Sequence, residues 1–156
     1  MQSAMLAAVV MTLLQSCASP PKPSPVTCPP DVRPAPEWRA VVDSTGEYWL
    51  RVPPSLEPVE PDKYFFVHGG DVWEDEDASV TISFGHWAET SFEKVPGERC
   101  RTRINGTDVF LIVSPDTVLA WYANDPGRHE PVVRVSTKKG DVGALAAVAL
   151  SLERAQ

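Results

Sequence analysis

The sequence lacks the local motifs that identify common enzyme and nucleotide-binding families. It contains no G-x-S-x-G nucleophile elbow, no phosphate-binding loop, no dinucleotide-binding glycine pattern and no H-E-x-x-H zinc motif. We therefore expect no enzymatic activity and no catalytic residue. A hydrolase is the alternative, because a serine, a histidine and an aspartate can meet in a fold without leaving a local signal.

Metal-binding patterns are missing as well. The three histidines, His68, His86 and His129, lie far apart, and none has a partner at ligand spacing, so we expect no metal site and no cofactor. Acidic residues gather in residues 71–77, but without the residue order of an EF-hand loop. We interpret this acidic run as a solvated loop, with cation binding as the alternative. It comprises Asp71, Glu74, Asp75, Glu76 and Asp77.

Basic residues are in the minority. The 156-residue chain has 14 Lys and Arg against 21 Asp and Glu, which gives a formal net charge of -7. Nucleic-acid binding depends on neutralising phosphates with basic side chains, so this balance argues against a nucleic-acid partner. The length and a hydrophobic content of 43% predict one globular domain with a single core.

Long hydrophobic runs are absent, and the one apolar stretch lies at the amino terminus. Residues 4–14 are small or apolar apart from Thr12, which is too short to span a bilayer and typical of the core of a signal peptide. The stretch ends in Leu14-Gln15-Ser16-Cys17, which resembles the bacterial lipobox. The resemblance implies a signal peptide over residues 1–16, acylation of Cys17 and a membrane anchor on the periplasmic or extracellular side of the cell envelope. An ordinary secretory signal or a merely apolar terminus is the alternative.

Only three cysteines are present. If Cys17 is acylated, Cys28 and Cys100 remain as a pair, and paired cysteines of exported proteins are normally bridged. Such a disulfide encloses about 70 residues and stabilises the domain by about 4 kcal/mol in the chain-entropy model. The alternative is a free, buried Cys100 and an exposed Cys28. Residues 17–37 are rich in proline and predict an extended tether, which leaves residues 38–156 for the domain.

Alternating apolar and polar residues predict an antiparallel sheet. Strands are expected at residues 39–43, 48–52, 79–84, 117–123 and 132–137. The strongest signal is a hairpin over residues 99–113, because Asn105-Gly106 suits a two-residue turn. Its register places one set of side chains on the core face, namely Cys100, Ile104, Val109 and Leu111. The opposite face carries Arg99, Arg101 and Arg103, the arginine strip, together with Phe110 and Ile112.

The chain is expected to close with a helix from Asp141 to about Arg154, because apolar residues recur there at spacings of three and four. The fold class is therefore α+β, an antiparallel sheet of about five to seven strands with a C-terminal helix packed on it. The order of these elements resembles the PsbP/Mog1-type domains found in many exported bacterial lipoproteins. The resemblance spans about residues 38–154 and implies a non-catalytic role in binding or assembly.

These observations predict a non-enzymatic envelope lipoprotein that binds or helps assemble another envelope component; they indicate no oligomeric state. We expect Asp108 to neutralise Arg103, which leaves Arg99 and Arg101 free to bind an acidic or aromatic partner beside Phe110. Alternatively, the arginine strip pairs with the acidic run within the molecule. A polysaccharide-binding module is a further alternative, in which exposed aromatic residues stack on sugars. Trp49 is expected on the outer face of its strand, Trp87 follows a strand end, and Trp121 can point inward or outward.

Overall fold

The computed structural model describes residues 27–60, 70–84, 94–123 and 130–155. Ten strands and one short helix lie in these residues: β1 (Arg39–Val42), β2 (Tyr48–Val52), β3 (Glu57–Pro58), β4 (Gly70–Glu74), β5 (Ala78–Phe84), β6 (Glu98–Ile104), β7 (Thr107–Val113), β8 (Thr117–Tyr122), β9 (Pro131–Thr137), α2 (Ala146–Ala149) and β10 (Glu153–Arg154). Seven strands form a large sheet in the order β3-β4-β5-β9-β8-β7-β6, and β1, β2 and β10 form a small one. The paired strands are antiparallel.

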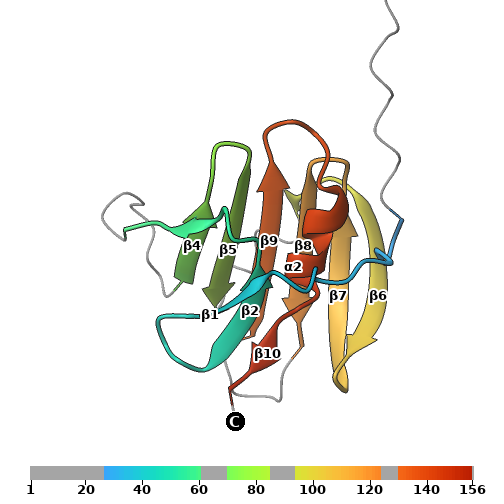
Figure 1. The fold of residues 1–156 in the computed structure, drawn as a ribbon. Coiled ribbons are helices and arrows are strands. Elements are labelled where there is room, and N and C mark those ends of the chain that lie inside the picture. The colour runs from blue at the N-terminus through green and yellow to red at the C-terminus, as the bar shows by residue number, and fades with distance from the viewer. Residues whose placement is uncertain (1–26, 61–69, 85–93, 124–129, 156) are drawn as a thin grey trace, which may run out of the picture.

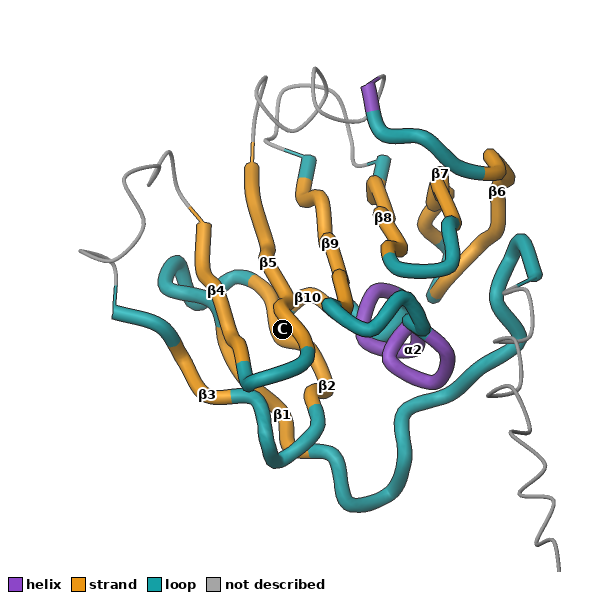
Figure 2. The backbone as a smooth tube through the Cα atoms, turned by 90° about the horizontal axis from the view of Figure 1, so that it is seen from above, coloured by secondary structure: helices purple, strands orange, loops and turns teal. Residues whose placement is uncertain are grey.

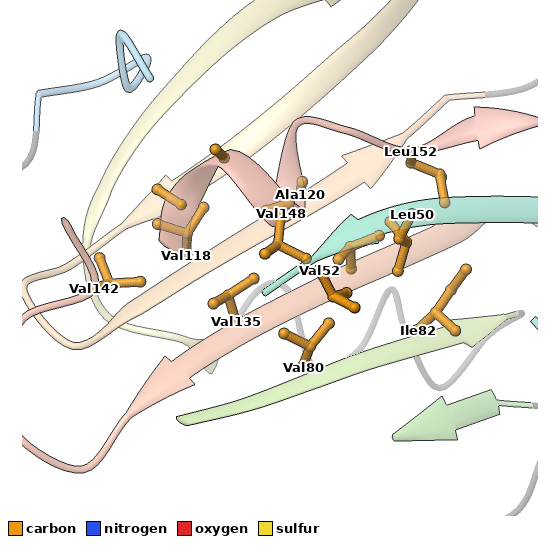
Figure 3. Close-up of a cluster of buried hydrophobic side chains, with 14 of the residues drawn as sticks. Leu50, Val52, Val80, Ile82, Val118, Ala120, Val135, Val142, Val148 and Leu152 are labelled. Carbon is orange, nitrogen blue, oxygen red and sulfur yellow. The ribbon is translucent and has the colours of Figure 1, made fainter. Parts of the chain in front are cut away.

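One face of the large sheet is covered, and the core lies beneath the cover. The large sheet curves around α2 and the small sheet (Figures 1 and 2). Between the layers, Leu50 of β2 and Val148 of α2 meet aliphatic side chains of β5, β8 and β9 (Figure 3). Burying one Val or Leu side chain contributes roughly 1.5–3 kcal/mol, so this two-layer packing is a main source of stability.

Strands β1 and β2 form where the sequence predicts them, and they pair as a hairpin. Its connection begins at Asp43, which is buried. The Asp43 carboxylate accepts hydrogen bonds from the backbone N–H of Tyr48 at 2.8 Å and of Thr45 at 3.1 Å. An aspartate that satisfies the backbone of its own turn favours this chain reversal.

The hairpin of β6 and β7 confirms the predicted register. Cys100 lies opposite Leu111, and Arg103 lies opposite Asp108. The turn residues Asn105 and Gly106 have φ angles of 48° and 83°, as a two-residue turn of this kind requires. Val109 and Leu111 are fully buried in the core, and Cys100 and Ile104 pack against it.

The predicted C-terminal helix is wrong in its extent. A 3-10 turn (Gly143–Leu145) precedes α2, and the chain then extends into β10, where Glu153 pairs with Trp49 of β2. The Ser151 hydroxyl ends the helix, because it donates to the carbonyl of Val148 at 2.8 Å and accepts from the N–H of Arg51 at 2.9 Å. The fold is consequently richer in strand than the α+β expectation.

The sequence analysis interprets the acidic run as a loop, but the run lies only partly in a loop. Asp71 and Glu74 belong to strand β4, which the sequence analysis missed along with β3, and Asp75, Glu76 and Asp77 connect β4 to β5. Trp73 of β4 is buried in the core and accounts for the formation of this strand.

Residues ahead of β1 pack on the domain. Val32 and Ala35 contact the core cluster, and a disulfide joins Cys28 to Cys100 of β6, with a Cα–Cα distance of 5.8 Å. The paired cysteines predicted from the sequence therefore form a bridge, which fixes the start of this segment beside the edge of the large sheet. No helix among the described residues is long and apolar enough to cross a membrane.

Candidate functional site

The outer face of the large sheet carries a row of cationic and aromatic side chains at its β6 end. The register places Arg101 of β6 beside Phe110 of β7, and Phe110 beside Trp121 of β8. The Arg101 guanidinium lies 5.3 Å from the centre of the Phe110 ring, within the range of a cation–π contact. The Phe110 and Trp121 rings are 5.6 Å apart. The row therefore continues from the edge strand to the third strand of the sheet.

The charges of this row differ from the expectation. Arg101 lies 2.5 Å from the Asp108 carboxylate, whereas Arg103 lies 3.7 Å from it. Asp108 pairs with Arg103 as predicted, but the prediction that Arg101 stays free is wrong, because both arginines share one carboxylate. The two guanidinium groups remain in excess by one positive charge, and their side chains are 60% and 72% exposed. Exposed ion pairs of this kind add little stability.

The remaining member of the arginine strip, Arg99, contacts the backbone just ahead of β6. Arg99 donates hydrogen bonds to the carbonyls of Val95 at 3.2 Å and Gly97 at 3.4 Å. Val95 in turn packs against a small outer cluster that contains the fully buried Ile112. Arg99 thus holds the chain that covers Ile112, and the exposed part of the surface centres on Arg101, Arg103 and Phe110.

The acidic run lies at the other end of the large sheet. Four strands, β5, β9, β8 and β7, separate β4 from β6, so the alternative that the arginine strip pairs with this run is wrong. Asp77 instead pairs with Lys139 at 2.5 Å. These positions leave the arginine strip without compensation from the most acidic part of the chain.

Asp75 of the acidic run is occupied by the fold. Partial burial raises the pKa of Asp75, but hydrogen bonds from Ser55 and from the N–H groups of Asp77 and Ala78 outweigh it and leave the pKa below its usual value. Among the described residues, no group of three or more His, Cys, Asp or Glu is arranged to hold a metal ion.

A groove of about 650 Å³ runs beside β6 on the covered side of the sheet. It lies between the segment bridged through Cys28 and the hairpin, and its lining includes Pro30, Val32, Thr102, Ile104 and Leu150. No sequence pattern indicates this groove, because its walls come from three segments that are distant along the chain. Its walls combine apolar side chains with the charges of Asp31, Arg33 and Arg103.

A smaller pocket of about 370 Å³ lies at the turn end of the hairpin. Its lining includes Tyr48, Ile104, Tyr122 and Leu152. The Tyr122 hydroxyl is buried and donates to the carbonyl of Ala149 at 2.7 Å, and burial raises the pKa of Tyr122 above its ordinary value. This hydroxyl is engaged in holding the C-terminal segment on the sheet.

The aromatic residues considered for sugar stacking occupy different places. Trp49 is half-buried under Arg51, whose guanidinium lies 5.6 Å from its ring. Trp121 is half-buried and its indole N–H donates to Glu130. The Phe110 and Trp121 rings are inclined by 42°. Trp87, His68, His86 and His129 lie outside the described residues, as does Cys17.

No protein-family model matches the chain, and no curated protein is similar to it in sequence.

Proposed function

We propose that the protein is a non-enzymatic lipoprotein of the cell envelope that binds another envelope component through the outer face of β6, β7 and β8. The observation that carries the proposal is the row of Arg101, Phe110 and Trp121, in which an exposed guanidinium stacks on an aromatic ring. Arginine and aromatic residues are enriched at the centres of protein interfaces. A planar guanidinium also binds carboxylates through two parallel hydrogen bonds.

The anchoring part of the proposal rests on the amino terminus. Leu14-Gln15-Ser16-Cys17 supports acylation of Cys17, and a bridge between the two other cysteines suits an oxidising compartment. Ten residues separate Cys17 from Cys28, and a proline-rich chain of that length reaches about 30 Å. The domain would then work close to the membrane surface.

Two other functions rank lower on the described geometry. A polysaccharide-binding module favours a flat platform of aromatic rings, and the inclination of Phe110 to Trp121 disfavours stacking on one sugar plane. A hydrolase needs a nucleophile and a base beside a pocket. Among the described residues, the linings of the groove and of the smaller pocket contain no serine, cysteine or histidine.

Site-specific photo-crosslinking in the envelope of an expressing cell tests the binding role. A photoreactive side chain at position 103 should capture a discrete envelope component. The same side chain at position 51, an exposed site on the small sheet, is the matched control and should not capture it. Equal capture from both positions, or none from position 103, would contradict the proposed surface.

Cys17→Ala tests the anchoring role separately. The wild-type protein should fractionate with membranes and carry an acylated mature terminus, and the variant should be released or remain unprocessed. A mature wild-type protein whose Cys17 carries no acyl group would contradict the lipoprotein assignment without affecting the binding surface.

A further inference from the structure

We propose that β6 is an open docking edge that pairs with an extended segment of another protein in which acidic and apolar residues alternate. The inference rests on the proposed binding role of this end of the sheet and names the class of partner. Three features carry it, namely the backbone of β6, the charges on its outer face and the groove on its covered side.

The backbone of β6 presents hydrogen-bonding groups to the outside. Ile104 and Thr107 close the two-residue turn, so Ile104, Thr102 and Cys100 bond to β7, and the alternate residues direct their N–H and C=O groups away from it. Within the described part of the chain, β6 ends the sheet and the outward groups of Arg101 and Arg103 have no backbone partner. An added strand would satisfy them, as in other cases of strand addition.

The two sides of β6 set different requirements for such a strand. Residues of the partner directly opposite Arg101 and Arg103 would point to the outer face, where the guanidinium groups exceed the Asp108 carboxylate by one charge. Acidic side chains fit these positions, because opposite charges in facing positions stabilise a sheet. The residue between them lies opposite Thr102 and would point to the groove, where Val32 and Ile104 favour an apolar side chain.

A second copy of this chain is a poor occupant of the same edge. Antiparallel pairing of two β6 strands would place arginines of one copy against arginines of the other, and like charges in facing positions destabilise a sheet. The arginines thus oppose self-association and favour an acidic partner. Charge complementarity therefore selects the occupant.

A fluorescent synthetic peptide of alternating glutamate and valine tests the docking edge. Purified full-length protein should bind this peptide saturably, and a peptide with lysine in place of glutamate should not bind. Methylation of the glutamate backbone nitrogens removes the hydrogen bonds to β6 and should weaken binding about tenfold or more. Methylation of the valine nitrogens, which point away from β6, is the matched control and should change affinity much less.

Protein variants test the same contacts from the other side. The double change Arg101→Gln with Arg103→Gln should weaken peptide binding about tenfold or more. Arg134→Gln is the matched control, because Arg134 is exposed on the same face but lies on the interior strand β9, and it should leave affinity within about twofold. Circular dichroism spectra would establish that the variants are folded.

Several results would overturn the docking edge. They are the absence of saturable binding, equal binding of the lysine peptide, and indifference to the position of methylation. A dimer of the wild type in sedimentation that the double change strengthens would identify a second copy as the occupant instead. If the peptides fail while position 103 still captures an envelope component, the docking edge is wrong and the proposed binding function stands.

Discussion

The two faces of the β6–β7 hairpin differ in almost every physical property although they belong to the same fourteen strand residues. The covered face is mainly apolar, carries the disulfide and is fully buried at Val109 and Leu111. The outer face exposes Arg101 and Arg103. The comparison indicates that the exposed arginines of the outer face can change with little loss of stability, whereas Ile112 on the same face is buried and cannot.

The largest expected effect on the free energy of unfolding comes from removing the disulfide on the covered side. The double change Cys28→Ser with Cys100→Ser should lower the free energy of unfolding by about 4 kcal/mol, because it releases a loop with a sequence separation of 72 residues. Urea unfolding measures the change. A reductant should destabilise the wild type to a similar degree and leave the double variant unaffected. Equal midpoints for all samples would show that the bridge does not stabilise the covered face.

Leu111 and Phe110 are neighbours in β7 that point to opposite faces, so they allow the most direct test of the comparison. Leu111→Ala removes a fully buried side chain and should cost about 3 kcal/mol. Phe110→Ala removes a half-buried ring and should cost about 1 kcal/mol, while it impairs capture at position 103. If Phe110→Ala lowers the free energy of unfolding as much as Leu111→Ala does, the outer face is part of the core and the two faces do not differ in their contribution to stability.

The pH dependence of stability tests the role of Tyr122 on the covered side. Because its pKa is raised in the folded protein, the unfolded chain loses this proton first, near pH 10. The contribution of Tyr122 to stability should therefore be constant below about pH 10 and fall above it. Tyr122→Phe should cost about 1 kcal/mol at neutral pH through loss of the hydrogen bond to Ala149. The variant should lack much of the alkaline decline in a pH series of urea unfolding; an unchanged decline would assign it to other groups.

The smallest effect on stability is expected from Arg101→Gln on the outer face. The side chain is exposed, so the change should alter the free energy of unfolding by no more than about 0.5 kcal/mol. Photo-crosslinking from position 103 should nevertheless decrease in the same variant. A large loss of stability with undiminished capture would assign Arg101 to the fold.

The parts of the fold that could be predicted from the sequence are those determined by local chemistry. Asn105-Gly106 specifies a tight turn, and a two-residue turn fixes the register of the whole hairpin, so the faces of Cys100 and Leu111 followed correctly. Strand β2 was recovered because Tyr48, Leu50 and Val52 alternate with Trp49 and Arg51. Residue spacing alone was therefore enough to predict that the arginines lie on the face opposite the core.

Features that depend on distant contacts were not predicted. The C-terminal pattern suits a helix, but pairing of Glu153 with β2 and the bonds of Ser151 favour an extended end. Strand β4 contains acidic residues and was missed, because its formation depends on burial of Trp73 against the rest of the sheet. The register places Asp108 opposite Arg103, but the flexible side chain of Arg101, on the same face of β6, reaches the carboxylate more closely.

The bridge between Cys28 and Cys100 also determines how the domain bears mechanical load. A pull on the chain ahead of Cys28 would enter the sheet at Cys100 of β6 through the disulfide, and not only along residues 29–38. A partner bound along the free edge of β6 would receive the force directly through this strand. Strain would then pass from tether to partner within a single strand, while α2 and the small sheet remain unloaded.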